Sequence, residues 1–167
     1  MLTRLDMQLL RAMRTRGHGP RAEAAAKLFG KLGENGQVWV AIGFVGALVD
    51  QAHFEEWLLC AFLGPAAIVL NFAIKVVVRR QRPVLEGLPP LGGAPTSLSF
   101  PSAHATSSFA CATAMTRVAP EAAVLFLLAA VISAGRPYLG MPYPSDVVAG
   151  ALLGVGLGFA VPLGLVD

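Results

Sequence analysis

Charged residues are scarce in this chain. Asp, Glu, Lys and Arg make up only 14% of its 167 residues, whereas 55% are hydrophobic. Long apolar runs separate the few charged stretches, and a water-soluble domain of this length has too little interior to bury them. The composition therefore predicts a membrane protein whose partner is the lipid bilayer rather than nucleic acid. The length predicts one domain over residues 1–167.

Cysteines and metal-ligand patterns are also missing or rare. Cys60 and Cys111 both lie inside apolar runs, which is typical of small buried thiols. Neither their spacing nor any cluster of carboxylates and histidines matches a disulfide framework or a set of metal ligands. We therefore expect no disulfide, no metal and no cofactor.

The N-terminus lacks the long apolar core and the small-residue cleavage site of a signal peptide, so we expect it to be retained. Residues 3–31 predict one amphipathic helix or two, broken at His18-Gly19-Pro20. An apolar face (Leu5, Leu9, Leu10 and Met13) opposes a basic one (Arg4, Arg11, Arg14 and Arg16). This pattern predicts that residues 1–34 lie in the membrane interface and precede a bundle over residues 35–167.

Five apolar segments follow, and they predict an all-α, integral-membrane bundle of about five transmembrane helices. The expected spans cover about residues 35–50, 57–75, 103–118, 121–133 and 146–166. The third and fourth are short for a hydrocarbon layer of about 30 Å. We expect them to extend into flanking residues or to lie inside the bundle.

Charge predicts the orientation of these spans. The N-terminal segment and the loops 79–99 and 135–145 fall on one side, which holds twelve of the 13 Lys and Arg residues; Arg117 is the exception. Leaving out Lys75, Arg82 and Arg136 as candidate site residues still gives nine of ten. The positive-inside rule then places this side in the cytoplasm of a cell (inner) membrane.

A cluster of cations ends the second span: Lys75, Arg79, Arg80 and Arg82, followed by Pro83. Such a cluster commonly anchors lipid headgroups. Lys75 and Arg82 are two helical turns apart, however, so both side chains can point the same way. An ammonium and a planar guanidinium together suit phosphate oxygens. These residues alone leave both interpretations open.

The segment Pro101-Ser-Ala-His104 precedes the third span. Proline at a helix start, with Ser102 nearby, leaves backbone N–H groups aimed at the loop, which suits an anion. His104 can serve as a structural histidine. Beside an anion it becomes a candidate acid, because its unperturbed pKa lies near neutrality.

Arg136 and Asp146 flank nine residues of Pro/Gly-rich turn. Taken singly, Arg136 is compatible with a snorkelling interfacial cation and Asp146 with a helix cap. All three stretches nevertheless fall at the same predicted membrane face. We therefore expect them to converge on one phosphate group.

In order and spacing, these stretches resemble the type 2 phosphatidic acid phosphatase superfamily over residues 75–146. The tract 138–150 and the Leu5-Asp6 segment are also similar to that superfamily. The matching residues are Lys75-x6-Arg82-Pro83, Pro101-Ser-Ala-His104, and Arg136 followed ten residues later by Asp146. The resemblance implies an all-helical bundle and a metal-independent phosphomonoesterase that acts through a phosphohistidine. It also implies roles by position: Lys75, Arg82 and Arg136 bind phosphate, Ser102 and the backbone N–H of Ala103 add hydrogen bonds, His104 protonates the leaving oxygen, and Asp146 orients the nucleophilic histidine.

The nucleophile itself is missing. The family has histidine four residues before the aspartate, and here Pro142 stands there, with no nucleophilic nitrogen in its side chain. Ala103 also replaces the usual glycine, and Gly135 the usual serine. Three interpretations stay open: His104 takes over as nucleophile or as base for a water; the protein binds phospholipid without hydrolysing it; or the proline is an engineered change that traps a ligand.

The sequence therefore predicts a membrane lipid phosphate phosphatase. Its expected substrate is a lipid or polyprenyl-linked phosphomonoester, for which a polyprenyl-phosphoryl phosphoribose phosphate of bacterial cell-wall synthesis is one candidate by analogy. The alternative is a pseudophosphatase that binds phospholipid or assists a partner membrane enzyme. A channel or transporter is less favoured, because the cations cluster at one surface.

Overall fold

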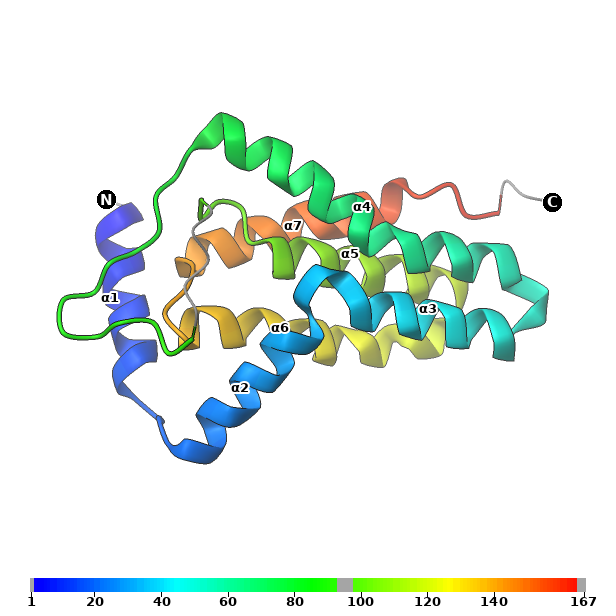
Figure 1. Cartoon of the computed structure of the whole chain (residues 1–167). Helices are drawn as coiled ribbons and strands as arrows, with labels where there is room; N and C mark the ends of the chain where they lie inside the picture. Colours follow the sequence, from blue (N-terminus) through cyan, green and yellow to red (C-terminus); the bar gives the residue numbers. More distant parts are fainter. Residues whose placement is uncertain (1, 93–97, 165–167) are drawn as a thin grey trace.

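The computed structural model describes residues 2–92 and 98–164, and this part of the chain is helical without a strand (Figure 1). The predicted all-α class is therefore confirmed. The α-helices are α1 (Leu2–Thr15), α2 (Pro20–Leu32), α3 (Gln37–Val49), α4 (Phe54–Val78), α5 (Ala103–Val118), α6 (Leu125–Tyr138) and α7 (Pro144–Ala160). Short 3-10 helices η1 (Glu34–Gly36), η2 (Gln51–His53) and η3 (Pro120–Val124) join some of them.

The five predicted spans correspond to α3 through α7. By length and apolar composition, two helical stretches among the described residues can cross a membrane, Gln51–Val78 and Pro120–Tyr138. A third counts if α2 and α3, which meet at a bend of 51°, form one broken span. The predicted number of five is therefore approximate. α7 is apolar but shorter, and α5 is short and rich in Ser, Thr and Ala.

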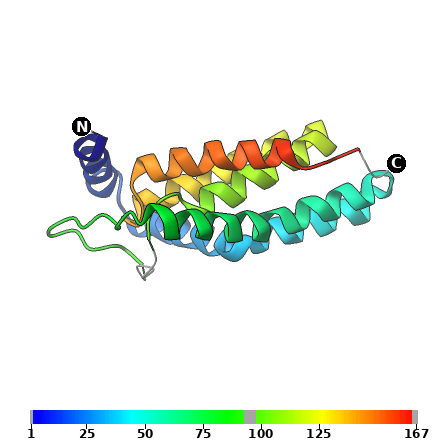
Figure 2. The ribbon, with the colours of Figure 1, turned by 90° about the horizontal axis from the view of Figure 1, so that it is seen from above.

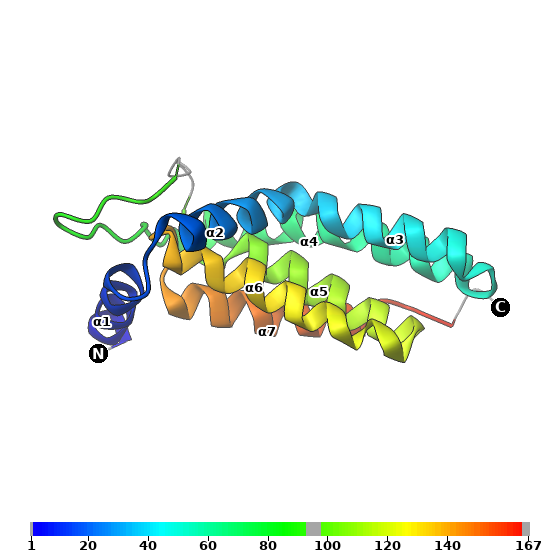
Figure 3. The same cartoon turned by 90° about the horizontal axis from the view of Figure 1, so that it is seen from below.

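α5 tolerates that composition because other helices surround it. It packs against α4, α6 and α7, and most of its residues between Ala105 and Met115 are fully buried. Viewed from above and below, α3 and α4 form one layer and α5, α6 and α7 lie against it (Figures 2 and 3). The expectation that a short span lies inside the bundle is met by α5.

Buried polar contacts fix the position of α5 within the bundle. The indole Nε1 of Trp39 on α3 donates to Ser108 Oγ at 3.1 Å, and Asn71 Nδ2 on α4 donates to Thr106 Oγ1 at 2.9 Å. In an apolar environment such polar groups stabilise a structure only when they are paired. These bonds therefore set the register of α3 and α4 against α5.

α1 lies across one end of the bundle, nearly perpendicular to the long helices (Figure 1). Its inward seam is Asp6, Leu10 and Arg14, all buried, while Leu5 and Leu9 are exposed. Arg14, which the sequence pattern assigned to the basic outer face, instead donates from Nη2 to the carbonyl of Pro89 at 2.7 Å. Leu10 likewise packs on protein rather than lipid. α1 is amphipathic, but the side of the helix that carries Asp6, Leu10 and Arg14 faces the loops of the bundle.

α2 differs more from the expectation of an interfacial helix. It packs along α6 and runs through Gly33 and η1 into α3. An amphipathic sequence looks alike whether its apolar face meets lipid or protein, so the pattern could not separate the two cases. As a result the end of α2 reaches the residues that form the site.

Candidate active site

A cavity of about 180 Å³ opens where the ends of α4, α5 and α6 meet three connecting segments. These segments are the α4–α5 loop, the α6–α7 loop and the break between α2 and α3. Since a water molecule occupies about 30 Å³ in the liquid, the space holds a phosphate group and several waters. The candidate residues that line it are Lys75, Arg82, Ser102, Ala103, His104, Arg136 and Pro142.

The three predicted phosphate-binding cations thus meet at one cavity, although Lys75 and Arg136 are 61 positions apart in sequence. α4 supplies Lys75, the following loop supplies Arg82, and the last turn of α6 supplies Arg136. Three positive charges around one small space favour an anion of high charge density, such as a phosphate. Their roles in binding stay predictions.

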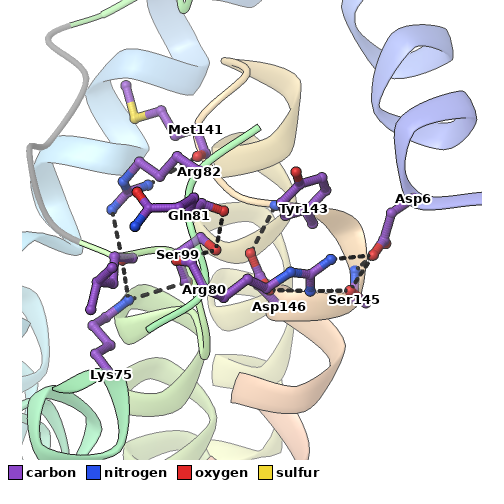
Figure 4. A network of polar contacts seen from close by, with 11 residues as sticks. Asp6, Lys75, Arg80, Gln81, Arg82, Ser99, Met141, Tyr143, Ser145 and Asp146 are labelled. Carbon is purple, nitrogen blue, oxygen red and sulfur yellow. Dashed lines mark hydrogen bonds and ion pairs between the residues drawn. The ribbon is translucent and has the colours of Figure 1, made fainter. Parts of the chain in front are cut away.

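Backbone carbonyls orient two of these cations (Figure 4). Lys75 Nζ donates to the carbonyls of Leu98 and Ser99 at 2.8 and 3.2 Å. Arg82 Nη1 donates to the Met141 carbonyl at 2.9 Å, next to Pro142. Burial lowers the pKa of the Arg82 guanidinium. Both loops around the cavity are therefore held in place by the same cations that line it.

Arg136 is closed in by the end of α2. A methyl group at Gly30 would lie 3.0 Å from Arg136 Nη1. The side chain of Arg136 makes no hydrogen bond or ion pair with the residues that the structure describes. A guanidinium that faces a cavity with its N–H groups unbonded suits an anionic ligand.

The start of α5 forms another part of the wall. Ser102 precedes the helix, and its hydroxyl makes no hydrogen bond to the first turn. The first backbone N–H groups of a helix have no intrahelical partner and lie at the positive end of its dipole, so they favour an anion. Ser102 and Ala103 both line the cavity, and the hydrogen bonds expected from them stay predictions.

His104 follows in the same turn and is mostly buried. Its Nε2 lies 3.0 Å from the Gly30 carbonyl of α2. In a neutral ring that bond places the proton on Nε2 and leaves the Nδ1 lone pair available. Of the chain's three histidines it is the one that lines this cavity.

Pro142 lies in the cavity wall, at the position where the family pattern requires histidine. The other histidines do not replace it. His18 bonds to the Met13 carbonyl at 2.8 Å and stacks on Tyr138. His53 bonds to Asp50 at 2.9 Å in the α3–α4 turn, toward the other end of the bundle (Figure 1). The prediction that neither substitutes for the nucleophile agrees with these positions.

Arg80 joins two buried carboxylates, a link that the sequence did not reveal (Figure 4). Its Nη2 donates to Asp6 Oδ2 at 2.7 Å and its Nη1 to Asp146 Oδ1 at 2.6 Å. The guanidinium also lies 4.0 Å over the ring of Tyr143. Asp6 in turn accepts hydrogen bonds from the backbone N–H and hydroxyl of Ser145, at 3.0 and 2.6 Å. The network joins α1 to the first turn of α7, directly after the loop that carries Pro142.

Asp146 is fully buried in this network and is not among the described residues that line the cavity. Its Oδ2 accepts the Tyr143 backbone N–H at 3.0 Å, as a helix-capping carboxylate does. Both oxygens are thus bonded without a histidine. The helix-cap interpretation is confirmed, and the catalytic role of Asp146 stays a prediction.

Packing shifts the pKa values of Asp6 and Arg80, two charged residues of this network that lie outside the spans. Burial raises the pKa of Asp6, but hydrogen bonds from Ser145 and Arg80 outweigh it and hold the pKa below the usual 3.8. Burial lowers the pKa of Arg80, and its bond to Asp6 and the nearby charge of Asp146 raise it above its ordinary value. Both groups are therefore charged at neutral pH.

The comparison with known proteins decides the family. The sequence pattern of the PAP2 superfamily matches residues 55–165, about two thirds of the chain, and this stretch includes every predicted site residue from Lys75 to Asp146. The chain belongs to the PAP2 superfamily. The resemblance of the three motifs is confirmed, and this PAP2 protein is a membrane phosphatase of that type.

Two named relatives of this PAP2 chain are similar over most of its length. The decaprenylphosphoryl-5-phosphoribose phosphatase of Mycolicibacterium smegmatis is 41% identical over 136 residues, 78% of this chain and 72% of the relative. The protein of the same name from Mycobacterium tuberculosis is 37% identical over 145 residues, 85% of this chain and 80% of the relative.

Two crystal structures share the PAP2 fold. The PAP2-type phosphatidylglycerolphosphate phosphatase of Bacillus subtilis has a TM-score of 0.76 at 22% identity, covering 95% of this chain and 83% of that one. LpxE of Aquifex aeolicus has a TM-score of 0.73 at 24% identity, covering 93% of both chains. These similarities establish the helical membrane fold.

Proposed function

We propose that this PAP2 protein removes the phosphomonoester from a polyprenyl-phosphoryl phosphoribose phosphate, in the cell (inner) membrane and with its site on the cytoplasmic face. The observation that carries the proposal is the 41% identity, over 78% of the chain, to a phosphatase named for decaprenylphosphoryl-5-phosphoribose. The orientation rests on the charge asymmetry of the loops.

The cavity supports the chemistry of this substrate. Lys75, Arg82 and Arg136 neutralise the phosphate and its developing charge, and the first turn of α5 adds backbone donors. The cavity lies near the end of the bundle where α1 crosses (Figure 1). A lipid tail can stay in the bilayer while the phosphate enters.

His104 carries the reactive nitrogen in this proposal. With its Nε2 proton bound to the Gly30 carbonyl, Nδ1 either attacks phosphorus or takes a proton from an attacking water. In both cases the bond from phosphorus to the sugar oxygen breaks, and that oxygen leaves with a proton from water or from the protonated ring. A phosphohistidine formed by the first route is then hydrolysed by water, which releases phosphate. Lys75, Arg82 and Arg136 hold the phosphoryl oxygens in both cases. Metal ions are not part of this scheme, because the cations supply the positive charge.

A second candidate is a pseudophosphatase that binds the lipid phosphate without turnover. The observation that favours it is Pro142 in the cavity wall, since the phosphate-binding residues are present and the usual nucleophile is not. The two candidates share the substrate and differ only in hydrolysis.

Phosphate release from the purified protein in detergent separates them. We expect wild type to release phosphate from a polyprenyl-phosphoryl phosphoribose phosphate, and His104→Ala to lower the rate by about 100-fold or more. Arg79→Gln is the matched control, since Arg79 is an exposed cation of the same cluster that bonds the Val76 carbonyl. Lipid binding without release from wild type would favour the pseudophosphatase.

A further inference from the structure

Part of the cavity wall lies outside the segment that matches the PAP2 pattern. Glu34 and Asn35, in the break between α2 and α3, line the cavity and are exposed at its rim. Asn35 has φ 53° and ψ 15°, and the next residue, Gly36, has φ 72°. Two successive left-handed residues turn the chain sharply there and present both side chains at the opening.

The position of this turn is fixed by packing. A methyl group at Gly36 would lie 3.3 Å from the backbone of Gly64 on α4, and one at Gly33 would lie 2.6 Å from Ile132 and 3.1 Å from His104. The glycines on either side thus allow the turn to seat against α4 and α6. Glu34 and Asn35 are thereby held beside the reactive histidine.

Glu34 and Asn35 differ in chemistry from the three cations that line the same cavity. Glu34 is the one carboxylate among the described residues that line the cavity, and it is close enough to Arg136 for their charges to attract. Neither Glu34 nor Asn35 makes a side-chain hydrogen bond within the described part of the chain. A carboxylate repels a phosphate but accepts hydrogen bonds from hydroxyls, and an amide both donates and accepts.

We propose that Glu34 and Asn35 bind the vicinal hydroxyls of the sugar that carries the phosphomonoester, and so select a sugar phosphate over a lipid phosphate without hydroxyls. Carboxylates bind ribose hydroxyls in the same way in dinucleotide sites. A site built to pair with hydroxyls discriminates strongly against an analogue that lacks them, because its polar groups then stay unpaired. This inference rests on the proposed function and names the substrate feature that it recognises.

The test combines two substrates with three proteins. The substrates are a polyprenyl-phosphoryl phosphoribose phosphate and its analogue without the two ring hydroxyls; the proteins are wild type, Glu34→Ala and Glu55→Gln. Glu55 is the matched control, an exposed carboxylate at the opposite end of the bundle. We expect wild type to prefer the hydroxylated substrate by roughly tenfold in kcat/KM, mostly through KM. Glu34→Ala removes most of this preference, because it lowers kcat/KM on the hydroxylated substrate relative to kcat/KM on the analogue, whereas Glu55→Gln keeps the preference.

Binding gives the same comparison without turnover. Non-hydrolysable phosphonates of both substrates are titrated into the three proteins, and the same loss of preference is expected in Kd. If wild type binds both phosphonates but releases phosphate from neither substrate, hydrolysis fails while the preference is still measured. An equal loss on both ligands in Glu34→Ala, or an unchanged preference, overturns the inference.

Discussion

Pro142 and His104 face the same cavity, and the contrast between them defines the chemistry of the site. A proline side chain has no lone pair to offer, whereas His104 keeps one nitrogen free of its bond to Gly30. The residues predicted to bind the anion therefore all line the cavity, and one of the two imidazoles of the family pattern is absent. Covalent catalysis is slower when the usual nucleophile is lost, because another group then has to take part in both forming and hydrolysing the phosphorylated intermediate.

The substitution Pro142→His restores that imidazole. We expect the rate of phosphate release to rise at least tenfold, and a phosphohistidine to become trappable with labelled substrate, because the rest of the cavity is assembled. The rate is measured in detergent beside wild type and Pro142→Ala, which removes the ring without adding a nucleophile. A variant that folds and binds substrate but gains no rate would contradict this view of the site.

Asp6 offers a prediction of pH dependence. Its pKa is held below 3.8, so its bonds stabilise the protein above that pH and are lost as the pH falls through the lower, folded-state value. We therefore expect the melting temperature of wild type to exceed that of Asp6→Asn at pH 6, with the gap closing below about pH 4. Thermal melting in detergent from pH 3 to 7 measures it. A gap that is independent of pH would show that the charge of Asp6 has no such role.

The residues that meet at the cavity could be predicted from sequence where a motif is local. Lys75, Arg82, Ser102, Ala103, His104 and Arg136 were found by spacing and order, and all of them line the cavity. Arg80 was grouped with them because it is adjacent in sequence, yet its partners are carboxylates 66 and 74 residues away. Such distant pairs leave no local signal, and neither does Glu34, which belongs to no motif.

At the scale of elements, the boundaries of α4 and α5 were predicted to within three residues, because these apolar runs end at Pro, Gly or charged residues. The ends of α6 and α7, at Tyr138 and Ala160, differ from the predicted 133 and 166 by five and six residues. The predicted spans 57–75 and 103–118 compare with α4 at Phe54–Val78 and α5 at Ala103–Val118. The contacts between helices were not predicted. Arg117 is an example: it was an exception to the charge rule, and its Nη1 caps the end of α7 by donating to the Gly158 and Val161 carbonyls at 2.8 and 2.9 Å.

The contact between α5 and α7 depends on small residues. Gly150, Gly154 and Gly158 recur every fourth residue on α7 and lie against α5. A methyl group at Gly154 would be 2.4 Å from the Thr106 carbonyl oxygen, while one at Gly156 would meet nothing within 4 Å. Close approach of this kind is a common way for membrane helices to associate.

Gly154→Ala is therefore expected to destabilise the protein and Gly156→Ala to leave it unchanged. The first forces α7 away from α5, at a cost of about 1–3 kcal/mol, and shifts the start of α7 that carries Asp146. Melting temperature and phosphate release in detergent report both effects. Equal stability of the two variants would contradict the packing described here.

At the scale of the whole molecule, the site lies at the end of the bundle that α1 crosses, and this end carries nearly all of the positive charge. The perpendicular position of α1 agrees with a helix lying along a membrane surface (Figure 1). The Asp6–Arg80–Asp146 network then connects that surface helix to the α4–α5 loop and to the first turn of α7. Hydrogen bonds and ion pairs thus join α1 to segments that lie next to the site.

Labelling of single cysteines tests the orientation. Arg16→Cys lies at the site end and Glu121→Cys at the other, and the natural Cys60 and Cys111 are buried. In intact bacterial cells we expect a membrane-impermeant maleimide to label Glu121→Cys, and to label Arg16→Cys only after permeabilisation. The reverse pattern would place the site outside the cytoplasm.

The central claim is that cations from three separate parts of the chain hold one lipid phosphate. Titration of a non-hydrolysable phosphonate of the proposed substrate into purified protein measures this without requiring turnover. We expect Arg136→Ala and Lys75→Ala each to weaken binding by roughly tenfold or more, as the loss of a charged hydrogen bond predicts, while Arg79→Gln binds like wild type. Wild-type affinity in Arg136→Ala and Lys75→Ala would contradict the account.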